Sequence, residues 1–347
     1  MSVVYKKLED VCEILDSRRV PITAKDRKAG AYPYYGANGL QDYVADYIFD
    51  DELVLLAEDG GNFGSKERPI AYRVSGKCWV NNHAHVLKAK PNMHVDYLCY
   101  ALMFYDTEGL VNGATRQKLT QAAMRQMVIP YRDMTEQLQI IEKISQIVRS
   151  IEKRKEELQL LDQLVKSRFI ELFGDPIKNT QHRPTTAFVN VVTMQRGFDL
   201  PVQDREQSGN IPVYGSNGVL DHHNQSKACN GGVITGRSGT IGKVFYTRGA
   251  YWPLNTTLFS VDTHENNIIY LAHLLRMFNL ARFTEGTGVP TLNRNKFHSA
   301  PIIDVPIDEQ NQFAAFVEQT DKSKLAVQKG LQELEILKKS LMQQYFG

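Results

Sequence analysis

One glycine-rich segment contains residue types that bind phosphate groups. Residues 236–244 read GRSGTIGKV and partly resemble the loop that cradles the phosphates of a bound nucleotide. The spacing to Gly242-Lys243 is one residue too long, however, and Val244 stands where a Ser or Thr would ligate magnesium. The segment therefore favours a glycine turn between strands that carries basic side chains toward phosphates.

Two acidic clusters could supply metal ligands to a nuclease. They are residues 50–52, which read DDE, and the pair Glu58-Asp59. Nothing like them occurs at the corresponding place in the second half of the chain. We therefore expect solvated acidic loops.

A pair of histidines is the other candidate for metal binding. His83 and His85 lie beside Asn81 and Asn82, and imidazole is a common metal ligand. The alternatives are a polar loop that contacts bases or the DNA backbone, and a structural histidine with its ring nitrogens satisfied. We expect one of these two, and no metal site.

Missing motifs exclude two further chemistries. An adenine methyltransferase signature needs adjacent prolines, and none of the 13 prolines is next to another. Cys12, Cys78, Cys99 and Cys229 include no Cys-x-x-Cys spacing, so reduced thiols are expected rather than a zinc ribbon. The sequence predicts no catalytic residue and no cofactor.

Basic and polar side chains in predicted loops are of the kind that contacts DNA. Lys and Arg bind phosphates, and Arg, Asn, Gln, Asp and Glu read base edges. In the first half the candidates are Arg18, Arg19, Lys25, Lys66, Arg68, Asn82, His83, Arg116 and Lys118. In the second half they are Arg196, His222, His223, Arg237, Lys243, Arg294 and Lys296. We favour the candidates that recur at equivalent places in both halves.

The chain is an internal repeat, and the repeated elements must position these loops. YGANG at 35–39 returns as YGSNG at 214–218, each two residues after a Pro. Further matches pair Trp79, Asn82, Tyr97-Leu98, Gly113, Leu119, Glu136-Gln137 and Phe173-Gly174 with Trp252, Asn255, Tyr270-Leu271, Gly286, Leu292, Glu309-Gln310 and Phe346-Gly347. The offset is 179–180 early and 173 later. An ordered series along the whole chain indicates duplication.

Each repeat combines a β-rich module with a long helix. Residues 53–57 and 232–235 are predicted to be buried strands, with 243–246 continuing the second sheet, and 97–105 and 268–278 to be short amphipathic helices. After each module an apolar stripe follows the heptad spacing of a coiled coil. Its members are Ile140, Ile144, Ile147, Ile151, Leu158, Leu161 and Val165 in the first helix, and Phe313, Val317, Val327, Leu331, Leu334 and Leu341 in the second. One such stripe fits an ordinary core helix, whereas two favour mutual antiparallel packing.

The order and motifs of these elements resemble the specificity subunit of type I restriction–modification systems. The shared features are Tyr-Gly-x-Asn-Gly after Pro, Trp-x-x-Asn, the later Glu-Gln, and Phe-Gly after each long helix. The resemblance covers the whole chain, which is somewhat short for the family. It implies an α+β fold with two pseudo-symmetric α/β target-recognition domains separated by two long antiparallel coiled-coil helices. The expected boundaries are 1–133 and 175–306 for the domains and 134–174 and 307–347 for the spacer helices.

The resemblance also implies a function. Each recognition domain would read one half of a bipartite site in double-stranded DNA, and the helices would set the gap between the half-sites. Two adenine-N6 methyltransferase (modification) subunits and a motor-nuclease restriction subunit would be the partners. The chain itself would be a non-catalytic, cytoplasmic subunit without a membrane segment.

The charge balance limits how such a protein can bind. The chain has 41 Lys and Arg against 39 Asp and Glu, a formal net charge of +2. A uniformly basic coat protein is therefore excluded, but local basic patches are not. The longest apolar run, residues 97–105, is far too short to cross a bilayer.

Three alternatives remain open from the sequence. One is a specificity subunit of a related system, in which methylation and cleavage are fused in one partner. The others are a stand-alone metal-dependent nuclease that uses the acidic clusters, and a scaffold whose helices organise other proteins.

Overall fold

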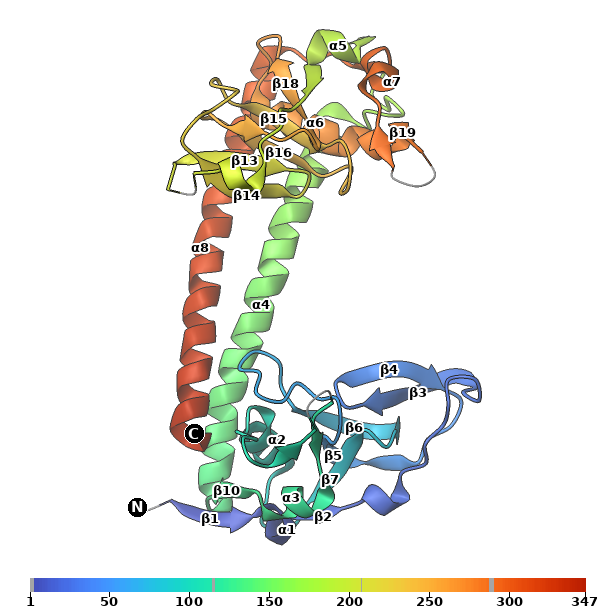
Figure 1. Cartoon of the computed structure of the whole chain (residues 1–347), viewed down its shortest axis with the longest axis vertical. Coiled ribbons are helices and arrows are strands. Elements are labelled where there is room, and N and C mark those ends of the chain that lie inside the picture. The colour runs from blue at the N-terminus through green and yellow to red at the C-terminus, as the bar shows by residue number, and fades with distance from the viewer. Residues whose placement is uncertain (1–2, 114–115, 207, 287–289) are drawn as a thin grey trace. The chain divides into compact units, whose positions relative to one another are not determined.

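The computed structural model describes residues 3–113, 116–206, 208–286 and 290–347. The chain forms two compact units (Figure 1). The first unit is Met1–Arg154 together with Gly330–Gly347, and the second unit is Lys155–Lys329. The first unit is therefore discontinuous in sequence.

The first unit is built on a six-stranded sheet. Its strand order is β2-β7-β5-β6-β3-β4, and neighbours are antiparallel except β3 and β6. Residues 53–57 of the central strand β5 are fully buried because both of its faces are covered. The elements are β1 Val4–Lys7, α1 Leu8–Val11, β2 Cys12–Ile14, β3 Ala29–Gly36, β4 Gly39–Val44, β5 Phe49–Ala57, β6 Ala71–Val80, β7 Ala84–Ala89, α2 Val95–Met103, β8 Val111–Asn112, β9 Lys118–Leu119, α3 Gln121–Gln126, β10 Val128–Tyr131 and α4 Met134–Phe173.

The second unit repeats this topology in two smaller sheets. A four-stranded sheet has the order β12-β18-β15-β16, and a three-stranded sheet has the order β14-β13-β17. The counterpart of the long strand β6 is broken into β16 and β17. The elements are β11 Thr185–Ala187, α5 Phe188–Val191, β12 Thr193–Arg196, β13 Ile211–Gly215, β14 Gly218–His223, β15 Gly232–Gly236, β16 Val244–Thr247, β17 Trp252–Pro253, β18 Thr257–Asp262, α6 Ile268–Phe278, β19 Thr284–Glu285, β20 Thr291–Leu292, α7 Arg294–His298, β21 Pro301–Ile303 and α8 Ile307–Phe346. The predicted internal repeat is thus confirmed at the level of strand order.

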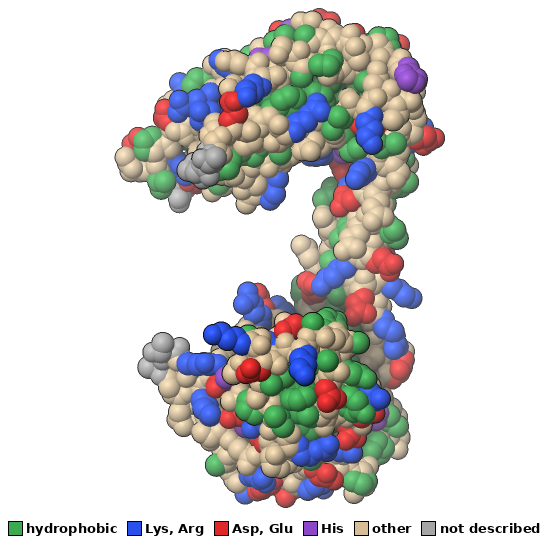
Figure 2. Space-filling view, turned by 90° about the vertical axis from the view of Figure 1, so that its right-hand side faces the viewer, with side chains coloured by type: hydrophobic (Ala, Val, Ile, Leu, Met, Phe, Trp, Pro, Cys, Tyr) green, Lys and Arg blue, Asp and Glu red, His purple; other side chains and the backbone are tan. Residues whose placement is uncertain are grey.

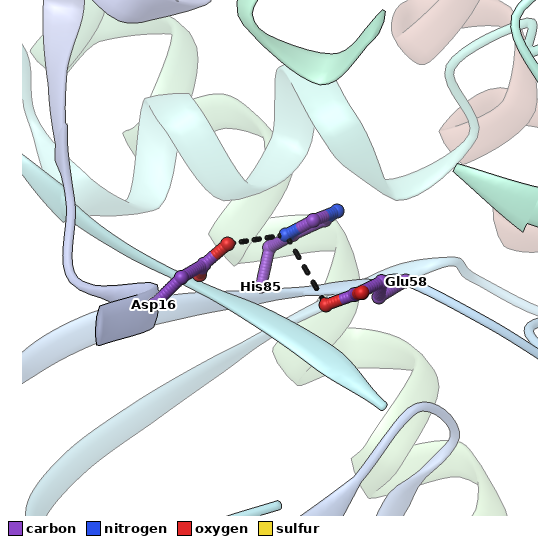
Figure 3. A group of neighbouring side chains, drawn as sticks. All are labelled: Asp16, Glu58 and His85. Atoms are coloured by element: carbon purple, nitrogen blue, oxygen red, sulfur yellow. Dashed lines mark hydrogen bonds and ion pairs between the residues drawn. The ribbon is translucent and has the colours of Figure 1, made fainter. Parts of the chain in front are cut away.

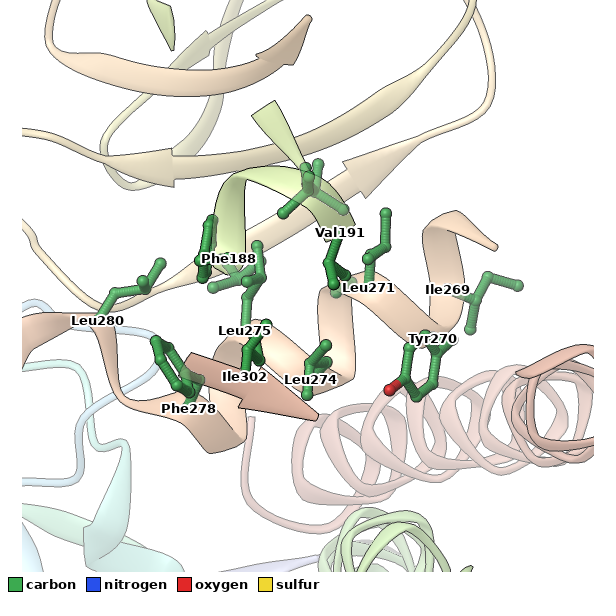
Figure 4. Close-up of a cluster of buried hydrophobic side chains, with 14 of the residues drawn as sticks. Phe188, Val191, Ile269, Tyr270, Leu271, Leu274, Leu275, Phe278, Leu280 and Ile302 are labelled. Carbon is green, nitrogen blue, oxygen red and sulfur yellow. The ribbon is translucent and has the colours of Figure 1, made fainter. Parts of the chain in front are cut away.

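Helix α6 is the centre of the second unit's core (Figure 4). Its apolar positions recur at the spacing of one helix face, and Ile269, Leu271 and Leu275 are almost completely buried. Phe188 of α5 and Ile302 of β21 belong to the same cluster. The strongly periodic segment 268–278 therefore forms the helix that its sequence predicts.

The two long helices each contain 40 residues, and both start in one unit and end in the other. In the second unit the end of α4 packs against the start of α8, since Phe169 and Phe313 have ring centroids 5.4 Å apart. In the first unit the start of α4 shares a core with Met342 at the end of α8. The helices are therefore antiparallel, as expected.

The heptad positions differ in how deeply they are buried. Ile140, Ile144, Ile151, Val165, Phe313, Val317 and Val327 are buried. Ile147, Leu158, Leu161, Leu331, Leu334 and Leu341 are partly buried. Burial thus varies along each helix: Ile151 and Val327 are buried near the middle, whereas Leu341 near the end of α8 is only partly buried.

A buried glutamine fixes the start of each long helix to its module. Gln137 of α4 is completely buried; its Oε1 accepts from His94 N (2.8 Å) and its Nε2 donates to Arg132 O (2.8 Å). Gln310 of α8 does the same with Asn267 N (2.9 Å) and Val305 O (2.7 Å). Both glutamines bond the residue that caps the N-terminus of a short helix, α2 or α6.

An aromatic pair holds the end of each long helix in the same way; Phe173, Tyr270 and Tyr97 are buried, and Phe346 is partly buried. Phe173 at the end of α4 packs on Tyr270 of α6, with ring centroids 5.2 Å apart. Phe346 at the end of α8 packs on Tyr97 of α2 at 5.0 Å. Each short helix thus receives the start of one long helix and the end of the other.

The described residues also bear on membrane segments and on the state of the cysteines. No helix that they form is both long enough and apolar enough to cross a membrane. Cys12, Cys78 and Cys99 are buried free thiols, and Cys229 is an exposed one.

Phe169→Ala should strongly destabilise the second unit. Phe169 is fully buried against three aromatic rings, so truncation leaves a cavity and should cost about 3–5 kcal/mol of unfolding free energy. Urea unfolding followed by Trp252 fluorescence, in a Trp79→Phe background, measures this effect. Leu164→Ala, at a position 47% exposed on the same helix, is the control and should cost less than about 1 kcal/mol. Equal costs would contradict the packing described here.

Candidate nucleic-acid interface

A tight hairpin turn marks the candidate interface in each unit. Strands β3 and β4 are joined through Ala37-Asn38, with Gly39 at φ +107°, and β13 and β14 through Ser216-Asn217, with Gly218 at φ +110°. A side chain would strain both glycines at these angles. The glycine of the Tyr-Gly-x-Asn-Gly motif therefore permits the turn.

The asparagine of each turn bonds a neighbouring loop. Asn38 Nδ2 donates to Gly60 O (3.0 Å) in the loop after β5. Asn217 Oδ1 accepts from Lys243 Nζ (2.6 Å) in the loop after β15. The hairpin tip and the following loop thus form one surface in each unit, and the asparagine side chains join the two.

The same backbone hydrogen bonds hold Glu58 and Arg237 after strands β5 and β15. The bonds are Glu58 N to His83 O (2.8 Å), Leu119 N to Glu58 O (2.7 Å), Arg237 N to Thr256 O (2.8 Å) and Leu292 N to Arg237 O (2.8 Å). The two residues therefore occupy equivalent positions in the two units.

Behind the first unit's loop lies a buried polar cluster of Asp16, Glu58 and His85 (Figure 3). His85 is completely buried; its Nδ1 lies 2.6 Å from Asp16 Oδ2 and 3.6 Å from Glu58 Oε2, and its Nε2 lies 2.9 Å from Leu119 O. Arg19 adds a guanidinium, with Nη1 2.6 Å from Glu58 Oε2. Both ring nitrogens of His85 thus have partners within the protein.

The cluster has the donor types of a metal site but is already charge-compensated. One ligand atom from each of the three residues lies within 4.8 Å of the others. However, Arg19 binds Glu58, and Gln121 Nε2 donates to Asp16 Oδ2 (2.9 Å). A cation would have to displace the guanidinium, so the residues fit a metal poorly and fit a structural network well.

The expectation of solvated acidic loops is wrong for Glu58 and Asp59, which are largely buried. It is partly wrong for residues 50–52, where Asp50 and Glu52 are exposed but lie on a strand. Residues 50–52 lie within β5, where Asp51 Oδ1 binds Lys88 Nζ (2.6 Å). The side chains of Glu58 and Asp59 are only 13% and 18% exposed. Cations from distant parts of the chain cover these carboxylates, and nothing in the local sequence indicates that.

The cluster lowers the pKa of Asp16. Burial by itself would raise the pKa of this carboxyl, but hydrogen bonds from His85, Val86 N and Gln121, with the charge of His85, outweigh burial and hold the pKa below its usual value. The ionised form is therefore the one that the fold stabilises.

The exposed side of the cluster carries the predicted basic residues of the first unit. Arg116 Nη2 lies 2.5 Å from Asp59 Oδ1, and Lys118 Nζ lies 3.1 Å from Glu58 Oε1. His83 Nδ1 lies 2.8 Å from Asp59 Oδ1. Arg116 and Lys118 are 60% and 49% exposed, so their outer atoms face solvent.

Of the other candidate DNA-binding residues of the first unit, some side chains bond to the protein itself and others are exposed to solvent. Arg19 is largely buried in its ion pairs, and Arg18 Nη2 donates to Ile48 O (3.3 Å). Lys25, Lys66, Arg68 and Asn82 are exposed, and no side-chain hydrogen bond of theirs occurs within the described ranges. Figure 2 shows basic and acidic side chains intermixed over this unit, the lower one in the view.

In the second unit most candidate DNA-binding side chains form no close ion pair with another described residue. Arg237 is partly buried, and its side chain has no hydrogen bond or ion pair to any described residue. Lys243 bonds only the neutral Asn217, and Arg294 Nη1 donates weakly to Met194 O (3.5 Å). Arg196 is 53% exposed and lies 3.8 Å from Asp199.

The remaining candidates of the second unit behave differently. His222 is exposed, whereas His223 is buried, accepts from Glu206 N (3.2 Å) and packs on the ring of Trp252. Lys296 forms an ion pair with Glu285. His223 therefore has a structural environment, while His222 is available at the surface.

Sequence reasoning missed Asp16 and Gln121 as members of the first interface. They lie 69 and 36 residues from His85, and no motif connects them. Only the repeat offers a signal, because Gln121 aligns with Arg294 at the offset of 173.

Both units thus carry the loop-rich, partly basic surface of a duplicated nucleic-acid-binding module. Residues 2–161 and 190–336 match the family model of the type I restriction modification DNA specificity domain. The chain belongs to this family.

Individual relatives agree with the family match. A protein of Haemophilus influenzae named as a type I restriction enzyme specificity subunit is 26% identical over 95% of this chain and 90% of its own length. A Mycoplasma pneumoniae protein named as a type I specificity subunit is 20% identical over 91% and 88%.

Solved structures share the fold. An S subunit of a type I restriction–modification system from M. genitalium aligns with TM-score 0.63 and 14% identity, over 100% of this chain and 96% of that one. A chain from a structural study of complex assembly and conformational transition in the type I system aligns with TM-score 0.61 and 14% identity, over 100% and 99%. The predicted α+β fold class is therefore confirmed.

Asp16→Asn should destabilise the first unit by about 1–3 kcal/mol at pH 7, because it removes a buried charged hydrogen-bond acceptor. Since the folded-state pKa of Asp16 is lowered from 3.8, its contribution is present above about pH 4 and is lost as the pH falls through the folded-state value. Urea unfolding against pH, followed by Trp79 in a Trp252→Phe background, should show a shallower acid loss for the variant.

Asp10→Asn is the matched control for this measurement, because Asp10 is exposed. It should leave both the stability and its pH dependence unchanged. An Asp16→Asn curve parallel to that of the wild type would contradict the proposed contribution of the carboxylate.

Proposed function

We propose that this chain is the DNA sequence-specificity subunit of a type I restriction–modification system. Each globular module reads one half of a bipartite DNA target. The chain performs no chemistry itself and directs adenine-N6 methyltransferase and restriction subunits to the target in the cytoplasm. Base flipping and methyl transfer belong to the partner.

The observation that carries this proposal is the duplicated loop surface. Both modules present a hairpin tip and a loop after the central strand in the same topological places. The predicted equivalence of the basic residues at 116–118 and 294–296 is wrong, because the first lie at β9 and the second open α7, but both segments adjoin the loop surface of their module. The family match in two copies supports the same conclusion. A bipartite target needs two such surfaces that can differ in sequence, and these differ in nearly every charged residue.

The proposed division of labour follows the secondary structure. Residues 1–133 and 175–306 act as the recognition domains, and 134–174 and 307–347 act as spacer helices that set the gap between half-sites. The heptad residues that pack these helices are those named above. Continuous helices of 40 residues are suited to this role because they are stiff over their length.

The long helices also offer a surface for the partners. Several of their apolar side chains are 47–68% exposed, which is unusual for large aliphatic residues on helices that already pack on each other. They are Leu138, Leu160, Leu164, Leu325, Ile336 and Leu337. Two modification subunits docked on the helices would cover them.

The stand-alone nuclease is less well supported. Among the described residues, the single cluster with metal-ligand geometry has its carboxylates bonded to Arg19 and Gln121. A partner with fused methyltransferase and nuclease activities remains an alternative within the same role.

Deleting the gene should abolish methylation of one bipartite adenine motif with a fixed gap. The reason is that the partner methyltransferase has no other means of choosing that target. Genome-wide mapping of N6-methyladenine in deletion and complemented strains measures this. An unchanged methylome in a strain that expresses the chain would contradict the proposal.

Lengthening both helices should lengthen the gap alone. A matched heptad inserted between Arg154 and Lys155 and between Lys329 and Gly330 adds about 10 Å of helix, or about three base pairs. Methylome mapping should show the same half-sites with the longer gap. A seven-residue insertion after the exposed Lys178 is the control and should leave the gap unchanged; altered half-site letters would refute the ruler role.

A further inference from the structure

The two modules place opposite charges on one shared backbone framework. Glu58 and Arg237 have the same pair of backbone hydrogen bonds. Asp16 and Arg196 also correspond at the offset of 180. Each lies two residues after an equivalent strand residue, Ile14 of β2 or Met194 of β12, which pair with Leu87 and Ser260. Arg237 therefore stands where the first module has a carboxylate. Arg196 does too, but at the same offset Arg19 corresponds to Asp199, so the pair Asp16–Arg19 (3.6 Å) returns with reversed charges as Arg196–Asp199 (3.8 Å).

The residues that follow Glu58 and Arg237 in the chain also differ in charge between the two modules. The isolated bridge Asp59–Lys118 of the first module is replaced by Ser238–Thr291 in the second. An acid–base pair is thus exchanged for two hydroxyl side chains. Nothing at these two positions of the second module can neutralise Arg237.

Within the first module the charges cancel. The cations Arg19, Arg116 and Lys118 lie 2.6, 2.5 and 3.1 Å from carboxylate oxygens of Glu58 or Asp59. A phosphate that binds Lys118 or Arg116 competes with a carboxylate that is already in place. Such an exchange gives less net attraction than binding a free cation.

Within the second module three of the predicted cations, Arg237, Lys243 and Arg294, form no ion pair with a described residue, whereas Arg196 and Lys296 are paired with Asp199 and Glu285. The side chain of Arg237 has no partner in the described part of the chain, and Lys243 and Arg294 bond only neutral oxygens. Arg237 is also partly buried, and both its backbone N–H and its C=O are hydrogen-bonded, which fixes the point from which its side chain extends. Arg in a fixed position reads guanine through O6 and N7.

We propose that Arg237 is a specificity-determining residue that reads a guanine in the half-site of the second module, and that Glu58 and Asp59 are positioning residues that preset Lys118 and Arg116 in the first. This proposal rests on the proposed function. It assigns to the second module most of the salt-dependent attraction for DNA, and to the first module a binding surface with little attraction for non-cognate sequence.

Asp59→Asn tests the role in the first module. Freeing Arg116 should add about one phosphate contact, which steepens the slope of log K against log salt by about 0.9 and raises non-specific affinity about eightfold at 0.1 M salt. Glu58→Gln should act in the same direction through Lys118. Because misfolding lowers affinity, a rise separates positioning from a structural role; unchanged or reduced affinity in both variants would overturn this part.

Arg237→Gln and Arg237→Lys test the second module. Both should weaken binding to the cognate site about tenfold or more and relax the choice of base at one pair of that half-site. Arg248→Gln, an exposed arginine paired with Glu318, is the control and should change neither. Equal weakening on every sequence, or full specificity in Arg237→Lys, would overturn the reading role.

The measurement uses the full chain in complex with its methyltransferase partner. Gel shifts from 0.05 to 0.3 M salt compare the cognate duplex with duplexes in which one half-site or both are scrambled. If the wild-type complex prefers no bipartite duplex, the proposed function fails. If it does, but the Asp59, Glu58 and Arg237 variants retain its salt slope and base preferences, this inference alone fails.

Discussion

The packing of each short helix, α2 or α6, against two long-helix ends is the contact on which the rest of the molecule depends. A hydrogen-bonded buried glutamine holds the start of one long helix, and the packing of a Phe ring on a buried Tyr holds the end of the other. A buried amide that lost these partners would be costly, so the arrangement fixes the helix position and not merely its proximity. The recognition loops are carried by modules that are anchored at these points.

Near-neutrality has a structural explanation. In the first module, carboxylates and cations from distant segments meet at one loop and cancel. In the second, Arg196 and Lys296 are paired with carboxylates, whereas Arg237, Lys243 and Arg294 form no ion pair among the described residues. The formal charge of +2 is thus the sum of two differently organised surfaces. This difference between the two surfaces suits a subunit that must bind non-cognate DNA weakly and that gains part of its DNA affinity from partner subunits.

Features set by local pattern could be predicted from the sequence. The helix at 268–278 and the long helix to Phe173 follow from apolar periodicity without an interrupting Pro, and the hairpin turns follow from Asn-Gly. The Asp16–His85 contact could not be predicted, because it joins residues 69 apart that share no motif. The burial of Glu58 and Asp59 could not be predicted for the same reason. The exposure of Glu58 depends on Arg19 and Lys118, and only the tertiary fold brings these two residues next to it. Which bases are read depends on side-chain geometry at the DNA, which no local pattern encodes.

The discontinuity of the first unit has a consequence for synthesis on the ribosome. Its core includes Met342, with the partly buried ring of Phe346 packed against it, and both follow the whole second unit in the sequence, whereas the second unit is one continuous segment. The first unit therefore begins to be synthesised before the second unit but can complete its core only after it. Tyr97 lacks its packing partner Phe346 until more than two hundred further residues have been synthesised. During that interval the uncovered apolar surface of the first unit is exposed to aggregation and proteolysis, and residues 330–347 remove this exposure when they pack on it.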